Sequence, residues 1–403
     1  MKIGIYLEGS PEMGGGFFQS LKASLLLIDI KKFECKIEII ITHKKTKTYL
    51  EKKNIKNKLF QLSKVNNYLS QLFEINYFRD LLNKIKINHP FYKFIKKNKY
   101  DMVIFLGPSQ MSKFCKEISF ISNIWDLDHK KNSQFPEHNS NNIYEQKEKL
   151  FKEITTRAFK IIVPHESNKN DLINFYKADK ANIITQNFIP MLPTIYNENK
   201  HNKELYNNLF KNFKLPTNKI IIFYPAQFWA HKNHKYIIDT AEILKNENNT
   251  KFLFVFCGGN KGNYKYIKNL IIKKKLDNLI KILTYISDDE VISLYLNSNG
   301  VVMPTYCGPT NLPIYESFYF KKIIFYTKGL IPNDSINDHL ISIDISSPMD
   351  FCRQLEIYSD TSKINKIVED NYEYYKLICN EITFKNNYEK ILNEFSYLLN
   401  RWK

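Results

Sequence analysis

A polar turn between a predicted strand and a predicted helix has the clearest chemical meaning in this sequence. Residues 301–320, VVMPTYCGPTNLPIYESFYF, begin with β-branched residues, break at Pro304 and pass through a Gly-Pro-Thr-Asn turn. Pro313 is typical of a first helical turn, and Glu316 lies about one turn into that helix. Backbone N–H groups at a helix start can hold an anion, so the stretch predicts an anion site with a carboxylate beside it. The alternative is an ordinary buried strand with a tight turn.

Two other loops carry ionisable side chains directly after predicted strands. Strand 118–125 leads to Asp126 and His129, and strand 220–224 leads to Lys232. Loops at the carboxyl ends of parallel strands are where α/β proteins bind ligands, so Asp126 and His129 can meet a hydroxyl group there. For each of them, hydrogen bonding within the loop is the alternative. A solvated surface position is the alternative for Lys232, although its aromatic loop is unusual for one.

A glycine run follows the first predicted strand, residues 2–8. Gly14, Gly15 and Gly16 precede a segment with apolar residues at helical spacing, which makes strand, loop and helix the first unit of a doubly wound sheet. Glycines here let the backbone approach a phosphate. The run is neither a Walker loop nor Gly-x-Gly-x-x-Gly, and a plain tight turn remains the alternative.

The remaining pattern alternates strands with helices and predicts two α/β domains. Further strands are predicted at 36–42, 101–107, 160–163, 181–190, 251–257, 280–286, 323–327 and 340–345, and helices at 142–159, 350–357 and 364–399. Ser287 and Glu290 form a capping box before another helix. The predicted boundaries are a first lobe at 1–195, a polar linker at 196–216, a second lobe at 217–370 and a final helical segment at 371–403.

Length and composition agree with two cores. The chain has 403 residues and 43% hydrophobic residues, with no apolar run long enough for a bilayer and no visible signal peptide. Six scattered cysteines without Cys-x-x-Cys spacing indicate buried thiols of a cytoplasmic protein. No metal site is expected, because His231 and His234 have no cysteine or carboxylate cluster beside them in sequence.

The formal net charge of +18 allows several partners. Nucleic acid, an anionic membrane surface and phosphorylated substrates are all compatible with it, and so is the biased codon usage of an AT-rich genome. Residues 43–100 are dense in lysine with interleaved aromatic and aliphatic residues. A solvated face over a core-packing stripe is the favoured interpretation, and a basic amphipathic surface lying on anionic lipid is the alternative.

These motifs together resemble glycosyltransferase family 4, retaining enzymes of the GT-B fold. The family carries two glutamates separated by seven residues, with Gly-Leu-Pro or a similar run before the second. Here the run Asn311 to Glu316 matches the second half, and Gly308 stands where the first glutamate would be. The form Gly-Pro-Thr-Asn-Leu-Pro resembles a subgroup of the family. The resemblance implies two doubly wound Rossmann-like lobes that face a central cleft, with the final helix returning to the first lobe.

The resemblance also implies roles for individual residues. Lys232 would grip the nucleotide diphosphate, with Gln227 where the family has an arginine, and Glu316 would accept hydrogen bonds from the ribose. Asp126 and His129 would lie at the acceptor, which makes these two, Lys232 and Glu316 the candidate catalytic residues. The implied donor-binding residues are Gly14, Gly15, Gly16, Gln227, Lys232, Tyr285, Ile286, Gly308, Thr310, Asn311, Leu312 and Glu316.

The implied activity is transfer of a sugar from a nucleotide-sugar donor to a saccharide or lipid-linked acceptor, with retained anomeric configuration. Surface polysaccharide or glycoconjugate assembly is the expected setting, in the cytoplasm or at the cytoplasmic face of the membrane through residues 43–100. Neither a metal nor a cofactor is implied, and nucleic acid is not an expected partner. A non-catalytic GT-B scaffold, favoured by Gly308 and Gln227, and a basic nucleic-acid-binding protein are the alternatives.

Overall fold

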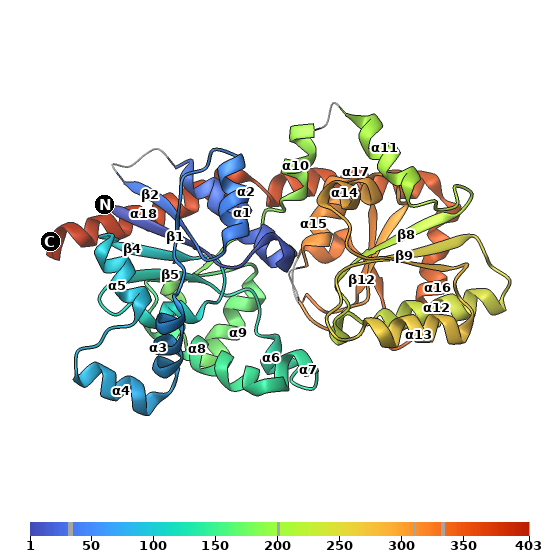
Figure 1. The fold of residues 1–403 in the computed structure, drawn as a ribbon. Helices are drawn as coiled ribbons and strands as arrows, with labels where there is room; N and C mark the ends of the chain where they lie inside the picture. The colour runs from blue at the N-terminus through green and yellow to red at the C-terminus, as the bar shows by residue number, and fades with distance from the viewer. Residues whose placement is uncertain (31–34, 200–201, 309–310, 332–334, 403) are drawn as a thin grey trace. The chain divides into compact units, whose positions relative to one another are not determined.

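Parallel strands with helices packed around them form two separate sheets (Figure 1). The computed structural model describes residues 1–30, 35–199, 202–308, 311–331 and 335–402. Within these ranges the first sheet has the order β3-β2-β1-β4-β5-β6-β7, the second has the order β10-β9-β8-β11-β12-β13, and all paired strands are parallel. The predicted fold class, two doubly wound α/β sheets, is confirmed.

The chain divides into two compact units, each built from more than one segment. Unit 1 comprises Met1–Leu127, Glu145–Ile189 and Asn380–Lys403, and unit 2 comprises Asp128–Tyr144 and Pro190–Cys379. The strands of unit 1 are β1 (Lys2–Leu7), β2 (Lys36–Ile41), β3 (Asn57–Leu59), β4 (Met102–Phe105), β5 (Ser119–Asn123), β6 (Lys160–Val163) and β7 (Ile183–Thr185). Those of unit 2 are β8 (Ile220–Pro225), β9 (Phe252–Cys257), β10 (Ile280–Leu283), β11 (Gly300–Met303), β12 (Ile323–Thr327) and β13 (Ile341–Ile343).

Helices connect these strands in both units. Unit 1 has α1 (Gly15–Ile28), α2 (Lys44–Lys52), α3 (Lys64–Glu74), α4 (Asn76–Lys84), α5 (Pro90–Lys97), α8 (Ile143–Arg157), α9 (Glu166–Tyr176) and α18 (Glu381–Trp402). Unit 2 has α6 (Asp128–Lys131), α7 (Pro136–Asn139), α10 (Leu192–Asn199), α11 (Lys203–Asn212), α12 (His234–Asn246), α13 (Tyr264–Lys274), α14 (Asp288–Asn297), α15 (Leu312–Tyr319), α16 (Pro348–Gln354) and α17 (Thr361–Ile378). Short 3-10 helices are η1 (Pro11–Met13), η2 (Gln110–Phe114), η3 (Ser140–Asn142), η4 (Lys180–Asn182), η5 (Ala230–Lys232), η6 (Ser335–His339) and η7 (Leu355–Ser359).

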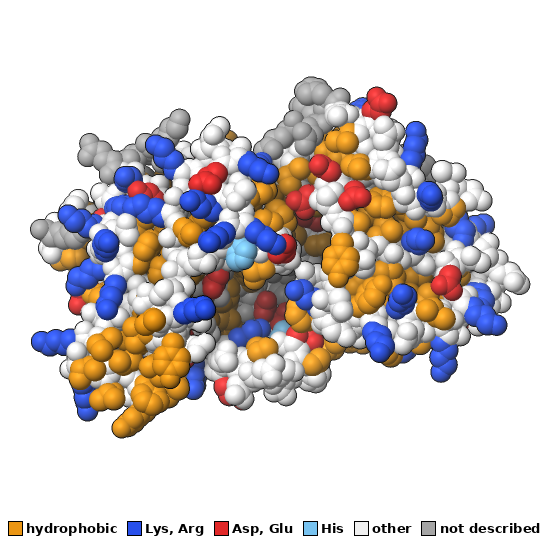
Figure 2. Space-filling view, in the orientation of Figure 1, with side chains coloured by type: hydrophobic (Ala, Val, Ile, Leu, Met, Phe, Trp, Pro, Cys, Tyr) orange, Lys and Arg blue, Asp and Glu red, His pale blue; other side chains and the backbone are white. Residues whose placement is uncertain are grey.

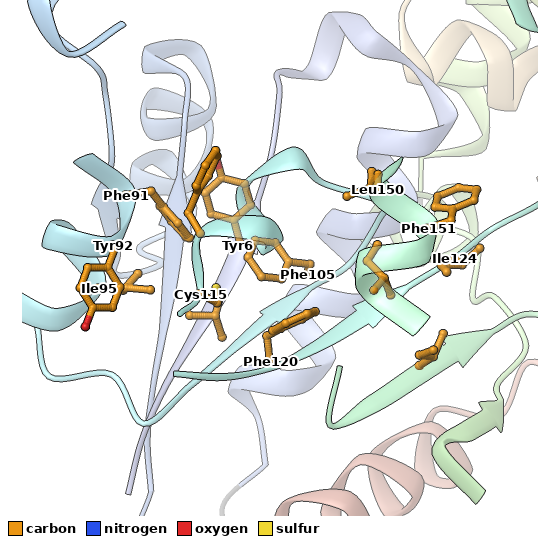
Figure 3. Close-up of a cluster of buried hydrophobic side chains, with 14 of the residues drawn as sticks. Tyr6, Phe91, Tyr92, Ile95, Phe105, Cys115, Phe120, Ile124, Leu150 and Phe151 are labelled. Atoms are coloured by element: carbon orange, nitrogen blue, oxygen red, sulfur yellow. The ribbon is translucent and has the colours of Figure 1, made fainter. Parts of the chain in front are cut away.

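Two hydrophobic clusters hold the sheet of unit 1. Figure 3 shows one of them, in which Tyr6, Phe91, Phe105 and Phe120 form a chain of aromatic contacts with ring centroids 5.2–6.1 Å apart. A second cluster joins α1 and the strands to the C-terminal helix α18, which contributes Phe384, Tyr388, Ile391, Leu392, Phe395 and Leu399. Full burial of such a side chain contributes roughly 1.5–3 kcal/mol, so α18 is an integral part of unit 1.

The observed units differ from the predicted boundaries at four places. Residues 128–144 belong to unit 2, and unit 2 resumes at Pro190, before the predicted end of the first lobe at residue 195. Unit 1 regains the chain at Asn380, and the predicted linker 196–216 contains helix α11. Asparagine and lysine dominate α11, but Tyr206 is buried and its carbonyl oxygen accepts a 2.6 Å hydrogen bond from Ser293 Oγ on α14. The apolar side of α11 packs on α14, although most of this helix is polar.

The predicted helix 364–399 is also interrupted. The chain ends α17 at Ile378 and begins α18 at Glu381. Asn380 Oδ1 accepts hydrogen bonds of 2.9 and 3.0 Å from the N–H groups of Ile382 and Thr383, so its side chain satisfies the first amides of a new helix. This break lets the two helices serve different units.

Each sheet reverses its strand order at one place. The reversal lies between β1 and β4 in unit 1 and between β8 and β11 in unit 2. Doubly wound sheets bind ligands in the loops at the carboxyl ends of the strands beside such a reversal. A ligand-binding site is therefore expected in the loops after β1 and β4 and in those after β8 and β11.

Candidate functional site

The loops after β8 and β11 are joined to each other by hydrogen bonds. The backbone N–H of Tyr306 donates to the carbonyl oxygen of His231 at 2.8 Å, and Thr305 Oγ1 donates to the same oxygen at 3.3 Å. Thr305 is fully buried, and Thr327 Oγ1 at the end of β12 donates to its carbonyl oxygen at 2.8 Å. These contacts hold the two loops at the switch point of unit 2 as one rigid framework.

Lys232 lies at the centre of this framework. Its Nζ donates a 2.7 Å hydrogen bond to Asn311 Oδ1, at the residue before α15. Asn311 Nδ2 donates to the hydroxyl of Tyr326 at 2.8 Å, and that hydroxyl donates to the Gly308 carbonyl oxygen at 2.8 Å. The network brings a cation to the start of α15, and the Asn311 side chain does not cap the helix amides. Both features favour binding of an anion.

The two histidines beside Lys232 are neutral at physiological pH. Burial, with the nearby Lys232 charge, lowers the pKa of His231 to about 4, and burial lowers the pKa of His234 to about 3. Burial opposes ionisation of Glu137, but hydrogen bonds from the His231 N–H and ring hold the pKa of this carboxyl below its usual value. Lys232 therefore supplies the positive charge of this loop.

Glu316 is buried within α15 and contacts a residue that the sequence did not identify. Its Oε2 accepts a 2.7 Å hydrogen bond from the hydroxyl of Tyr295 on α14, and only 7% of the residue is exposed. Burial raises the pKa of Glu316 to about 7, although the Tyr295 hydrogen bond opposes this shift. The carboxyl group can thus change protonation state near neutral pH.

Gly308 has a backbone that explains why no glutamate stands there. Its φ is +87°, and a Cβ on this residue would lie 3.2 Å from Oδ1 and Nδ2 of Asn311. Any L side chain would be strained at this φ. Two further residues of the predicted donor site follow Gly308 in sequence: Thr310 lies outside the described residues, and Leu312 begins α15.

Gly308→Ala should lower both stability and nucleotide-sugar binding. The left-handed backbone costs about 1–2 kcal/mol for a residue with a Cβ, and the new methyl group presses on the Asn311 side chain that holds Lys232. Gly329→Ala is the matched control, because its φ is +74° and nothing lies within 4 Å of its Cβ. Denaturant unfolding should show a lower free energy of unfolding in both variants. Calorimetry should show weaker binding of the donor only in Gly308→Ala. Equal donor affinity in the two would disconnect Gly308 from the site.

Gln227 is bound within its own loop. Its Oε1 accepts a 3.0 Å hydrogen bond from Trp229 Nε1, and the Trp229 ring lies 5.7 Å from Lys261 Nζ. The amide therefore orients an aromatic side chain. Lys261 is a second cation close to this loop that sequence reasoning missed.

Tyr285 and Ile286 lie in the loop between β10 and α14. The predicted strand 280–286 ends earlier, at Leu283, and Tyr285 has a positive φ of 60° and a side chain with 91% exposure. The capping box predicted after this loop is confirmed, since Ser287 and Glu290 bond each other's backbone. An exposed ring on a short, fixed loop can stack on a planar ligand.

The glycine run of unit 1 packs against a tryptophan. Gly14 precedes α1 with φ of 81°, Gly15 begins the helix, and a Cβ on Gly16 would lie 3.0 Å from the Trp125 ring. Gly107 after β4 approaches the same ring, with a hypothetical Cβ 2.7 Å away. Close packing of Trp125 at the switch point of unit 1 therefore accounts for Gly16, while Gly14 meets a backbone requirement.

Asp126 and His129 occupy different units. Asp126 is half-buried near the end of the first segment of unit 1, and His129 lies in α6 of unit 2. The expectation that His129 belongs to the first lobe is corrected by this division. His129 is fully buried, with its ring edge-on to Tyr144 at 5.5 Å. Its burial favours packing over contact with an acceptor.

His129→Ala separates packing from an acceptor role. Removing a fully buried ring should lower the free energy of unfolding by about 2 kcal/mol or more. The position of its loop predicts that transfer also falls while donor binding is spared. Thermal melting, donor calorimetry and transfer at saturating acceptor measure the three effects. A wild-type transfer rate per folded molecule would leave His129 with a packing role alone.

Several contacts of this site were beyond sequence reasoning. Tyr295, Tyr326 and Glu137 each bond a candidate residue or its loop, although none stands beside its partner in sequence. The position of Tyr326 near the carboxyl end of a predicted strand was one available signal. The other two come from helices.

The two sheets, their switch points and the loops described above define the GT-B class of α/β fold. Residues 206–373 match the family model described as "Glycosyl transferases group 1", which supports a glycosyltransferase group 1 domain over that part of unit 2. Comparison of whole chains gives the same class of fold. A glycosyltransferase from Rickettsia africae superposes with a TM-score of 0.69 at 17% identity, covering 98% of each chain.

Two named proteins are also similar to this chain. HepE of Anabaena, solved in complex with UDP-glucose, superposes with a TM-score of 0.71 at 14% identity, covering 98% of this chain and 100% of HepE. The capsular polysaccharide biosynthesis glycosyltransferase CapH of Staphylococcus aureus is 26% identical over 209 residues. That match spans 50% of this chain and 53% of CapH, about half of each protein.

Proposed function

We propose that this protein is a retaining glycosyltransferase that moves a sugar from a nucleotide-sugar donor to a saccharide or lipid-linked acceptor. The observation that carries the proposal is the network of Lys232, Asn311 and Tyr326 at the β8/β11 switch point, where a cation meets the start of α15. A diphosphate is an anion that such a pairing can bind. The group 1 match over the same unit supports this assignment.

Unit 2 would hold the donor along its loops. The diphosphate lies at Lys232 and the α15 amides, and the ribose hydroxyls donate to Glu316, one of whose oxygens already accepts from Tyr295. Tyr285, with its exposed ring, stacks on the nucleobase. Uracil is the first base to test, because the HepE structure contains UDP-glucose.

Leaving-group stabilisation is the main chemical contribution that we assign to the protein. As the glycosidic bond breaks, negative charge grows on the diphosphate, and Lys232 with the helix amides stabilises that charge. A phosphate oxygen of the donor takes the acceptor proton during attack on the same face of the sugar. This route needs no protein nucleophile, and it assigns no step to a metal ion.

A relative supports the setting that we propose. CapH is described as a glycosyltransferase of capsular polysaccharide biosynthesis, and surface polysaccharide assembly is the setting that we propose here. As acceptor we propose a growing saccharide, free or attached to a lipid, and as location the cytoplasm or the cytoplasmic membrane face.

A nucleotide-sugar screen tests the activity. Purified protein is melted with UDP-glucose, UDP-N-acetylglucosamine, a GDP-sugar and UDP alone, because a ligand that binds only the folded state raises its stability. The expected result is a raised melting temperature with one nucleotide class, followed by release of UDP or GDP when an acceptor extract is added. Binding without any turnover would indicate a non-catalytic scaffold, and no binding to any nucleotide would overturn the proposal.

A basic, apolar surface on unit 1 supports a peripheral membrane contact. Figure 2 shows hydrophobic side chains gathered over α3 and α4 with lysines around them, and the exposed residues there include Val65, Tyr68, Ile75, Tyr77, Leu81 and Ile85. Residues 43–100 contain 15 lysine or arginine residues and three acidic residues. Across the described ranges, no helix has the length and apolarity needed to cross a bilayer. We propose that this surface, residues 64–86, lies on anionic lipid.

Vesicle flotation tests the membrane contact. The protein should float with vesicles containing phosphatidylglycerol and stay behind with neutral phosphatidylcholine vesicles, and high salt should weaken the binding. Tyr77→Asp should abolish flotation, whereas Ile272→Asp, at a 54% exposed residue on the lysine-rich α13, should not. Equal flotation of both variants would place the contact elsewhere.

A further inference from the structure

Two histidines and a cysteine meet in unit 2. His138 lies in α7, His231 in η5 and Cys307 in the loop after β11. One possible ligand atom from each lies within 4.8 Å of the other two. His138 and Cys307 are buried, and the side chain of His231 is 12% exposed. Along the sequence His231 has no cysteine or carboxylate cluster beside it, but the fold brings both types of residue to it.

The spacing of two of these atoms matches coordination of a common ion. Cys307 Sγ lies 3.6 Å from His138 Nε2. A tetrahedral zinc ion with Zn–S of about 2.3 Å and Zn–N of about 2.1 Å separates its sulfur and nitrogen ligands by about 3.6 Å. A thiol-to-imidazole hydrogen bond also explains this pair, but it gives no account of the third residue. The possible ligand atoms of all three residues lie within 4.8 Å of one another, which is wider than the spacing around tetrahedral zinc, so the His231 ring must move towards the other two to close the site.

A carboxylate orients the third residue. The ring Nδ1 of His231 contacts Glu137 Oε1, and the same oxygen accepts a 2.9 Å hydrogen bond from the His231 backbone N–H. Histidines that bind metals usually donate one ring N–H to a carboxylate in this way, which fixes the tautomer and leaves Nε2 as the ligand atom. Cysteine with two imidazoles is a donor set that suits zinc.

We propose that His138, His231 and Cys307 bind one zinc ion, with water as the fourth ligand. On binding, the Cys307 thiol loses its proton to solvent and a zinc–sulfur bond forms, without any redox change. The ion would tie α7 to the loops after β8 and β11, directly beside Lys232. The site thus acts as a clip on the loops that carry the anion-binding network. This inference is independent of the sugar-transfer reaction.

Metal titration of the whole chain tests the site. Protein stripped with a chelator is titrated with zinc against a chromophoric competitor, and one equivalent should bind tightly. Cobalt should give the sulfur-to-metal charge-transfer absorption and the intense visible bands of a tetrahedral thiolate site. Cys307→Ser and His138→Gln should each weaken zinc at least tenfold. Cys257→Ser is the matched control, because this cysteine at the end of β9 is also buried but does not belong to the cluster with the two histidines.

Thermal melting and the cobalt spectrum distinguish a zinc site from a hydrogen bond. Zinc should also raise the melting temperature of the wild type and of Cys257→Ser, but not of Cys307→Ser. The cobalt spectrum uses the wild-type chain, so it remains decisive if a variant fails to fold. A cobalt spectrum without thiolate absorption, or zinc affinity unchanged in both site variants, would overturn the proposal and leave the Cys307–His138 contact as a hydrogen bond.

Discussion

Replacing Lys232 with alanine should lower turnover about a hundredfold or more at saturating donor. A charged donor aimed at the leaving group contributes about 3 kcal/mol to the transition state, because charge grows there as the sugar departs. The neighbouring histidines, His231 and His234, are neutral at physiological pH, so they cannot replace the lost charge. Nucleoside monophosphate, which lacks the second phosphate, should bind almost as well as before. Steady-state turnover and calorimetry with the monophosphate measure the two effects.

Two further variants make the Lys232 test specific. Lys235→Ala is the matched control, because Lys235 lies three residues later on α12, is 52% exposed and contacts Asp239. It should turn over like the wild type. Adding Gln227→Arg to Lys232→Ala should recover part of the rate by restoring a cation in the loop, although it sacrifices the hydrogen bond to Trp229. If Lys232→Ala retains full turnover in a chain that circular dichroism shows to be folded, the diphosphate is held elsewhere.

Glu316→Gln should weaken donor binding about tenfold to a hundredfold without unfolding the protein. A hydrogen bond between a hydroxyl and a charged acceptor contributes roughly 1.5–3 kcal/mol, and the neutral amide loses most of it. Its carbonyl oxygen can still accept from Tyr295, so the packing of α14 on α15 should persist. Glu369→Gln, on the surface of α17, is the control for a general loss of charge. Unchanged donor affinity in calorimetry would remove Glu316 from the ribose site.

The raised pKa of Glu316 gives the same residue a pH signature. Its folded-state pKa is about 7 against an ordinary value of 4.5, so between these pH values the folded protein keeps a proton that the unfolded chain releases. The free energy of unfolding should therefore fall as pH rises from 4.5 through 7, by on the order of 3 kcal/mol from this group. Glu316→Gln should flatten that part of the pH profile. Ribose hydroxyls favour the ionised carboxylate, so wild-type donor affinity should rise over the same range.

Local patterns predicted much of the fold. Strands 160–163 and 323–327 have the predicted bounds, and the Ser287 capping box is present, because each depends on residues adjacent in sequence. The elements that were not predicted depend on contacts with residues distant in sequence. Strand β3 has three residues within a lysine-rich stretch and is recognisable only by its pairing with β2. The helix in the predicted linker was likewise missed, because the burial of Tyr206 depends on residues distant in sequence.

The sequence predicted which residues belong to the candidate site, but it did not predict the contacts between them. Lys232 and Glu316 were singled out because each lies in or after a loop beyond a strand. Their partners, Asn311 79 residues away and Tyr295 on the preceding helix, follow only from the order of the strands. Burial decides the rest. His129 has the sequence context of an exposed loop residue, yet it is fully enclosed, and no local pattern reports that.

The docking of α18 in unit 1 has a consequence for synthesis on the ribosome. Domains near the N-terminus usually fold while the rest of the chain is still being translated. Here the face of the first sheet that contains Ile3 and Ile5 is completed by Tyr388 and Phe395, which emerge after the whole of unit 2. A stalled nascent chain ending before Asn380 should therefore contain a folded second unit and a first unit whose apolar sheet face is uncovered. Such a chain should be a preferred client of chaperones, and release of the last helix should end that dependence.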